Sequence, residues 1–262
     1  MLNILVCVKQ VPDINLVKMD PVTGSLIRAG VPAILNPLDA NALEAAVRVK
    51  EAHGGSITVI TMGPDMAKEA LRECLAAGAD RAVLLSDRAF ANADTLATSY
   101  VIVSAAKMLG DFDLIFCGKE SLDGATGQMG AQLAQRFGAA QVTGALLIKE
   151  VNEEAKTAVV ERELEDGVET LEVQLPCLFT MEKTNYPARI PNLKGKLAAK
   201  KAVITTITAD DIPGLDRNRI GDPGSPTKVP RMFPPVMPEP GIIIDEGSVE
   251  ASVAKLMQLI KD

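Results

Sequence analysis

The chain has 262 residues, of which 47% are hydrophobic and 23% are charged, a composition typical of one large or two small globular domains. The formal net charge of −7 argues against a nucleic-acid-binding protein. Neither a membrane-spanning run nor a signal peptide is recognisable. We therefore expect a cytoplasmic protein without membrane insertion, or an organelle-matrix protein that has lost a targeting segment. With one histidine, His53, and four cysteines without a C-x-x-C spacing, neither a metal site of the usual zinc types nor a histidine-dependent hydrolase is expected.

Strand and helix patterns alternate along the first half of the chain. A hairpin turning at DPVTG is expected within residues 17–30. Continuous aliphatic strands between amphipathic helices indicate a mainly parallel sheet that helices cover on both faces, and ligands bind such sheets beyond the carboxyl ends of the strands. The expected strands are 3–10, 56–63, 81–87 and 113–118, and the expected helices are 39–53, 64–78, 93–109 and 126–138.

After residue 140 the pattern changes. Residues 157–175 alternate apolar and polar side chains around Asp166-Gly167, which predicts a β-hairpin that extends the sheet. A basic stretch, 183–201, follows, and residues 211–240 then hold half of the sixteen prolines, which predicts an extended arm.

The last residues predict a helix with one apolar face, which either folds back on its own domain or clasps another subunit. The face consists of Val249, Val253, Leu256, Met257 and Ile260. We expect a nucleotide-binding α/β domain over 1–200 and, over 201–262, a Pro-rich arm whose terminal helix clasps a partner subunit.

The stretch CGKESLDGATGQMGAQLAQ, residues 117–135, leaves a buried strand and enters a helix through a glycine-rich loop. It has neither the spacing of a P-loop nor that of a dinucleotide fingerprint. The first N–H groups of the helix favour an anion, Gly127 and Gly130 would let a ligand approach the backbone, and Thr126 and Gln128 can donate to phosphate. The alternative is a turn in which Thr126 only caps the helix.

Other candidates follow the ends of the expected strands. Cys7 and Lys9 follow the first strand, and Met62 ends the next. In Asn36-Pro37-Leu38-Asp39, Asp39 (or Asn41) is expected to cap the helix, which leaves Asn36 without a capping role. Asp94-Thr95 begins the helix 93–109 and is either a cap or part of the site.

Six blocks of the sequence together resemble the β subunit of electron transfer flavoproteins, of the FixA type. In this order and spacing they are specific, and they cover nearly the whole chain. They are VCVKQVPD (6–13), NPLDANALEAAVRVKE (36–51), GADRAVLL (78–85), CGKESLDGATGQMGAQLA (117–134), VERELEDGVETLEVQLPCLFT (160–180) and NYPARIPNLKGKLAAKK (185–201).

The resemblance implies a Rossmann-like fold of the adenine nucleotide alpha hydrolase type and a heterodimer with an α subunit. An FAD shared with α would carry electrons between acyl-CoA-type dehydrogenases and other acceptors. The β pocket would hold AMP or, in bifurcating members, a second FAD. The candidate cofactor-binding residues are then Cys7, Lys9, Asn36, Leu38, Asp39, Met62, Thr95, Asp123, Gly124, Thr126, Gly127, Gln128 and Met129.

Within that family the compact loop DGATGQ favours a second FAD, because the AMP-binding type often carries extra residues there. The segment ADTLATS, 93–99, points the same way. Electrons from NADH would then pass to the α flavin and to a ferredoxin or flavodoxin. No side chain is expected to be catalytic, since the bound flavin would carry out any NADH oxidation. A non-bifurcating carrier with AMP is the alternative.

The resemblance also implies that the segment matching 185–198 docks the partner dehydrogenase through an apolar side chain, at Ile190 or Leu193. Pro187 and Pro191 would stiffen this tip, and the nearby lysines would steer an acidic partner. The alternative is a solvated basic loop. A rival function for the whole chain is a nucleotide-binding regulatory or hydrolase-like α/β protein that shares the fold.

Overall fold

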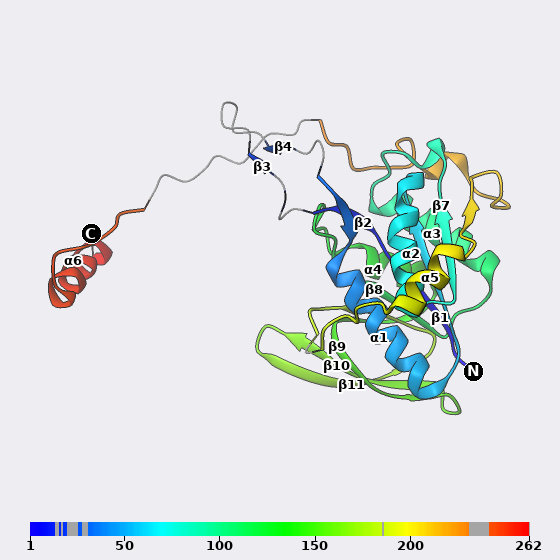
Figure 1. Ribbon diagram of the computed structural model, residues 1–262, viewed down its shortest axis with the longest axis horizontal. Helices are drawn as coiled ribbons and strands as arrows, with labels where there is room; N and C mark the ends of the chain where they lie inside the picture. The colour runs from blue at the N-terminus through cyan, green and yellow to red at the C-terminus, as the bar shows by residue number, and fades with distance from the viewer. Residues whose placement is uncertain are drawn as a thin grey trace.

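The structure is a computed structural model that describes residues 1–13, 16, 18–19, 26–27, 31–184, 186–230 and 241–261, with the backbone alone at 18–19 and 26–27. Within this part of the chain a nine-stranded sheet forms the centre (Figure 1). Across the sheet the strands are β11 (Gly167–Gln174), β10 (Thr157–Leu164), β9 (Ala140–Asn152), β12 (Cys177–Met181), β8 (Leu114–Gly118), β1 (Asn3–Cys7), β6 (Ser56–Met62), β7 (Arg81–Leu85) and β13 (Thr205–Ile207).

Neighbouring strands from β9 to β13 pair in parallel, and only β10 and β11 add antiparallel pairs. The mainly parallel sheet is therefore confirmed, and so is the hairpin of β10 and β11 that extends it. Parallel neighbours need crossover connections, and helices supply most of them here.

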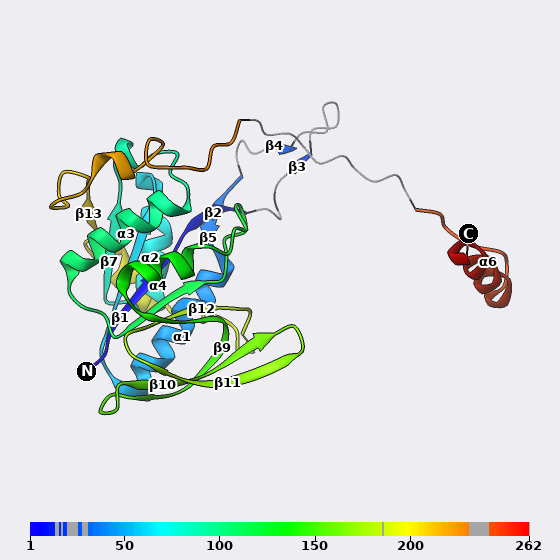
Figure 2. The ribbon, with the colours of Figure 1, turned by 180° about the vertical axis from the view of Figure 1, so that it is seen from behind.

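Helices cover both faces of the sheet (Figures 1 and 2). On one face lie α1 (Pro37–His53), α2 (Lys68–Ala77) and α5 (Leu193–Lys201), and on the other lie α3 (Thr95–Leu109) and α4 (Met129–Phe137). Smaller elements are the pairs β2 (Gln10–Pro12) with β5 (Ala33–Leu35) and β3 (Lys18–Met19) with β4 (Leu26–Ile27), and the 3-10 turns η2 (Asp65–Ala67), η3 (Arg88–Phe90) and η4 (Arg217–Arg219).

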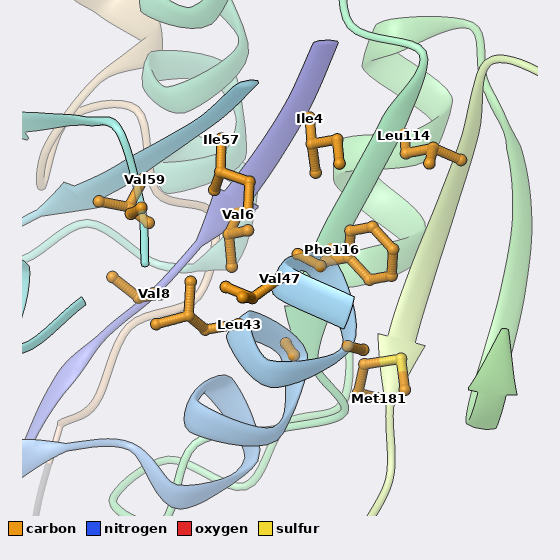
Figure 3. Packing of buried hydrophobic residues seen from close by; sticks show 14 of the residues in the cluster. Ile4, Val6, Val8, Leu43, Val47, Ile57, Val59, Leu114, Phe116 and Met181 are labelled. Carbon is orange, nitrogen blue, oxygen red and sulfur yellow. The ribbon is translucent and has the colours of Figure 1, made fainter. Parts of the chain in front are cut away.

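Alternate residues of the central strands enter two separate cores. Ile4 and Val6 of β1 pack with Leu43 and Val47 of α1 and with Phe116 of β8, as Figure 3 shows. The residues between them, such as Leu5 and Cys7, face α3 and α4 on the other side. Both faces of these strands are thus buried, which explains why they are continuous aliphatic runs rather than alternating ones.

All four expected helices begin at other residues than expected. Helix α2 starts at Lys68 instead of residue 64, after the turn η2, and α3 starts at Thr95 instead of residue 93, because Asp94 caps it. Helix α1 starts at Pro37, so Asn36 holds the N-cap position and Asp39 lies inside the first turn. Helix α4 starts at Met129 rather than at residue 126, because Ala125 and Gly127 have φ angles of 45° and 61° and a right-handed helix cannot pass through them. The pairing of β3 with β4 agrees with the expected hairpin, whose turn at DPVTG lies outside the described residues.

Besides the short pair β2 and β5 and the 3-10 turns, four elements were not predicted. Strand β12 is a buried five-residue run between β8 and β9, and β9 carries its apolar residues without a regular period. Helix α5 lies in the stretch expected to be a basic loop, where the Asn192 side chain caps it by accepting a hydrogen bond from the Gly195 amide at 2.8 Å. Strand β13 follows α5 and pairs with β7.

The chain after residue 200 continues to pack on the α/β body. Ile207, Ala209, Ile212 and Ile220 are buried in the core that α3 and α4 cover. The packed body thus extends beyond the proposed boundary at residue 200. The most proline-rich part of the expected arm, 231–240, lies outside the described residues.

The terminal helix, α6 (Val249–Lys261), has no buried residue and stands apart from the body in both ribbon views (Figures 1 and 2). Its apolar residues remain accessible, with Val249 at 76% and Ile260 at 67% exposure. Among the described residues no helix has the length and apolarity required to cross a bilayer.

Candidate functional site

A cavity of about 730 Å³ opens at the carboxyl ends of β1, β6, β7 and β8, where the sheet argument expects a ligand. It brings together ten of the predicted cofactor-binding residues from five segments of the chain. They are Cys7, Lys9, Asn36, Asp39, Met62, Thr95, Gly124, Thr126, Gly127 and Met129. The other three, Leu38, Asp123 and Gln128, lie beside these residues in the chain but do not line the cavity.

Asp39 joins the ends of two strands at the floor of the site. Its Oδ2 accepts the Lys9 amide and its Oδ1 accepts the Gly118 amide, each at 2.8 Å. A Cβ on Gly118 would lie 2.6 Å from Oδ1, so this approach requires glycine. Burial raises the pKa of Asp39 to about 7, although both amide hydrogen bonds oppose the shift. The expected capping role of Asp39 is therefore wrong.

Asn36 holds the glycine-rich loop to the start of α1. Its side chain is buried, donates from Nδ2 to the Glu120 carbonyl at 2.8 Å, and accepts the Leu122 amide at Oδ1 at 3.2 Å. Although Asn36 occupies the N-cap position, its side chain does not cap the helix. The segment NPLD therefore shapes the cavity from its first and last residues.

Lys9 and Asp123 form an ion pair between the end of β1 and the same loop. The Lys9 Nζ lies 2.7 and 2.9 Å from the two carboxylate oxygens of Asp123 and 3.4 Å from the Ser121 hydroxyl. Burial opposes ionisation of Asp123, but the hydrogen bonds from Lys9 and Ser121 outweigh it and lower the pKa of the carboxyl. Asp123 therefore stays ionised at neutral pH.

The amino terminus of α4 is uncapped. Its N-cap residue is Gln128, which makes no side-chain capping bond, so the alternative in which Thr126 caps this helix is wrong. The first N–H groups have no intrahelical partner, and together with the helix dipole they suit a phosphate. Gly127 has open space where a Cβ would stand, which lets a ligand come close to the backbone.

Thr95 lines the cavity, while its neighbour Asp94 caps α3. The Thr95 hydroxyl donates to Gln128 Oε1 at 2.9 Å and accepts from Gln132 Nε2 at 3.2 Å. Asp94 accepts the amides of Ala97 at 3.0 Å, within the helix, and of Thr227 at 3.0 Å, from the segment that follows residue 200.

Gln132 was missed by sequence reasoning, because a glutamine within a helix carries no local signal. Its Oε1 is the one buried side-chain oxygen or nitrogen of the described residues that lacks a hydrogen-bond partner. One helical turn from Gln128, it is in position to orient the Thr95 and Gln128 side chains.

The cysteines do not supply a nucleophile. All four are buried, and burial raises the pKa of Cys7 and Cys117, so both stay thiols at neutral pH. Among the described residues no three acidic, cysteine or histidine side chains are grouped so as to hold a metal ion. The polar groups of the site include those of Lys9, Asn36, Asp39 and Asp123.

The predicted docking residues lie far from this cavity in the chain. Ile190 is 89% exposed on the segment that precedes α5, and Leu193, at 73% exposure, begins that helix.

Comparison with known proteins identifies the family. The electron transfer flavoprotein domain matches residues 23–212. An electron transfer flavoprotein subunit beta from Thermoanaerobacterium thermosaccharolyticum is 46% identical over 98% of this chain and 97% of its own length. The chain belongs to the electron transfer flavoprotein family, as a β subunit of the FixA type.

Two further relatives have other names within this family. Subunit CarD of the caffeyl-CoA reductase-Etf complex of Acetobacterium woodii is 46% identical, over the whole of this chain and 98% of its own length. Protein FixA of Azorhizobium caulinodans is 40% identical over 99% of this chain and 94% of its own length. The resemblance drawn from the six sequence blocks is therefore confirmed.

Proposed function

We propose that this electron transfer flavoprotein β subunit pairs with an α subunit, shares an FAD with it, and binds a second FAD in its own cavity. A bound flavin supplies the electron-transfer chemistry, while the protein supplies binding, orientation and electrostatics. The heterodimer would then divide electrons from NADH between the α flavin and a ferredoxin or flavodoxin, in flavin-based bifurcation.

The observation that carries the second FAD is the size and make-up of the cavity. Its volume is about 730 Å³. It lies in the upper part of the roughly 300–1,000 Å³ range of small-molecule sites. The adenosine part of AMP and of FAD is the same, so the difference must lie beyond the phosphate. The compact loop 123–128 and the uncapped start of α4 leave room and unpaired donors there.

Within this cavity each group of the chain has a distinct task. The free amides at the start of α4, with Thr126 and Gln128, would bind the diphosphate. Asn36 and Asp39 would fix the loops around the adenosine. Lys9, half exposed and paired with Asp123, would supply a positive charge near the phosphates. None of these steps requires a side chain to exchange a proton.

Two surfaces would bind proteins. The apolar face of α6 would clasp the α subunit, because a helix with that face cannot remain in water without cost. Ile190 and Leu193 would dock an acyl-CoA-type dehydrogenase, with the lysines of α5 steering an acidic rim. The similarity to CarD supports this class of partner, since its complex joins an Etf to a reductase that acts on an acyl-CoA.

The deciding experiment is to co-express the chain with its α subunit and to measure FAD and AMP per heterodimer after denaturation. Two FAD and no AMP are expected, with flavin reduction by NADH. One FAD with one AMP, and no reduction by NADH, would contradict bifurcation and favour a simple carrier. A lone chain that binds AMP or ATP without flavin would instead favour a nucleotide-binding regulatory protein.

A further inference from the structure

A cluster of four charged side chains fastens the segment before α5 to the outer surface of α1. Arg189 lies at its centre. Its Nε donates to Glu44 Oε2 at 2.7 Å, and its two terminal nitrogens donate to Glu51 at 2.6 and 3.1 Å. The Arg189 backbone amide also donates to Glu44 Oε2, at 3.1 Å. One side chain thus binds two carboxylates of α1 that lie about two helical turns apart.

A second arginine completes the cluster from α1. Arg48 Nε donates to Glu44 Oε1 at 2.7 Å, and its guanidinium lies 4.1 Å from the centre of the Tyr186 ring. Glu44 accepts bonds from two guanidinium groups. Because it is only 3% exposed, these bonds lie in a partly dehydrated environment. Burial opposes ionisation of Glu44, but Arg189 and Arg48 outweigh it and lower the pKa of the carboxyl.

The segment held in this way carries a large aliphatic side chain that is almost fully exposed. Ile190 directly follows the clamped Arg189, is 89% exposed, and stands between Arg189 and Pro191. Asn192, which caps α5, fixes the other end. A single exposed isoleucine is ordinary in itself. An isoleucine whose backbone is anchored on both sides, by an arginine fork and by a helix cap, is presented in one orientation.

Fixing a loop in its bound conformation lowers the entropy lost on association. We propose that Arg189, held by Glu44 and Glu51, is a positioning residue that pre-orders the Ile190 tip for docking to the partner dehydrogenase. This inference rests on the proposed docking function of Ile190 and Leu193. The partner surface it fits is an apolar pocket with an acidic rim, because Lys194 and Lys196 follow the tip on α5.

The test uses the co-purified heterodimer and, as its probe, the acyl-CoA dehydrogenase encoded nearest to the chain. In Arg189→Ala, amide exchange over residues 186–192 should become at least about tenfold faster, since the anchoring bonds are lost. The KM for the dehydrogenase should rise about three- to tenfold, with kcat and flavin content unchanged, because only the ordering cost of docking changes. Arg189→Lys should restore part of both effects.

Two further variants separate the roles. Ile190→Ala should raise the KM without changing exchange over 186–192, because it removes the tip and leaves the anchor. Arg217→Ala, which removes an arginine paired with Asp210 elsewhere on the surface, should change neither. If Arg189→Ala folds poorly, Glu51→Gln removes half of the fork at an exposed position and should give smaller changes in the same directions.

The outcomes distinguish the positioning role of Arg189 from the docking role of Ile190. Faster exchange in Arg189→Ala without a change in KM, while Ile190→Ala raises the KM, would overturn the positioning role and leave docking intact. Unchanged exchange in Arg189→Ala and in Glu51→Gln would overturn the anchor. An unchanged KM in Ile190→Ala would overturn the docking function itself, whatever the anchor does.

Discussion

Replacing Asp39 by Asn tests whether the buried Asp39 carboxyl at the floor of the cavity makes the unfolding free energy depend on pH. Burial raises the folded-state pKa from its ordinary value of 3.8 to about 7, so the folded chain holds this proton more tightly than the unfolded chain does. The corresponding stability is fully present below the unfolded value and is lost as the pH rises toward 7. Asn cannot ionise, and it therefore lacks this dependence.

The size of the effect follows from the shift of about 3 units, which corresponds to about 4 kcal/mol at 1.36 kcal/mol per unit. The unfolding free energy of the wild type minus that of Asp39→Asn should fall by about this amount from pH 4 to pH 8. Asn has one acceptor oxygen fewer than Asp, so its side-chain NH2 group would face the backbone N–H of Lys9 or Gly118. This loss lowers the unfolding free energy of the variant by about 1–3 kcal/mol at every pH.

Urea unfolding of the two chains, followed by far-UV circular dichroism at pH intervals, measures this difference directly. The difference is needed because other carboxyls, such as Asp123 and Asp94, have lowered pKa values and destabilise both chains in acid. A difference curve that is flat, or that rises with pH, would refute the reasoning. It would mean that the two amide hydrogen bonds outweigh burial and that Asp39 is ionised throughout.

Three other predictions follow from the same contacts. Replacing Thr126 and Gln128 together by Ala should weaken nucleotide binding by at least about tenfold, since charge-assisted bonds to phosphate are lost; equilibrium dialysis with AMP and FAD measures it, and unchanged binding would contradict the phosphate role. Gly130→Ala should destabilise the fold by about 1–3 kcal/mol, because its Cβ would lie 2.1 Å from a side chain of β12, whereas Gly167→Ala meets nothing and should be neutral in thermal unfolding. Deleting residues 231–262 should abolish co-purification with the α subunit while far-UV circular dichroism still reports a folded body; co-purification of the truncated chain would show that α6 is not the clasp.

The position of that truncation depends on the structure. From the proline count alone, a cut at residue 211 would separate an arm from a domain. Ile212 and Ile220 are buried beneath the sheet edge, and Asp94 accepts an amide from Thr227, so that cut would open the core and the start of α3. A high proline content argues against helices and strands in this segment, but it does not show whether the segment packs on the domain.

The elements that were predicted are those with a strong local signal. Strands such as β1 and β8 are continuous aliphatic runs, and helices such as α2 and α4 have one clearly apolar face. Strand β12 is as short as β1 and β8, but it directly follows the expected hairpin and has Thr180 within its apolar run. Its pairing with β8 and β9 identifies it as a strand. Helix α5 was not predicted because its many lysines leave a weak amphipathic pattern, in which only Ala199 is buried.

The place of the candidate site was predicted from the ends of strands and its residues from the family resemblance, but the bonds among those residues were not predicted. Asp39 was assigned to a helix cap because its local neighbours suggest one, yet its partners, Lys9 and Gly118, lie 30 and 79 residues away. Asn36 likewise bonds to residues 84 and 86 positions distant. Local sequence contains no information on which loops a sheet brings together, so these contacts required the fold.

Those long-range bonds bear on the choice between AMP and FAD. The loop from Glu120 to Ala125 is fixed by Asn36, by the Lys9 ion pair with Asp123, and by its own turn, in which the Ala125 amide donates to Ser121 at 2.8 Å. Its compact shape is therefore built by the protein and does not depend on a ligand. Beyond it, the start of α4 has no side-chain cap, and the Thr95 hydroxyl is bonded to the side chains of Gln128 and Gln132 there. The wall around the adenosine would thus be preformed for either nucleotide, and selection between them must occur at the phosphates and beyond, where the donors are still free.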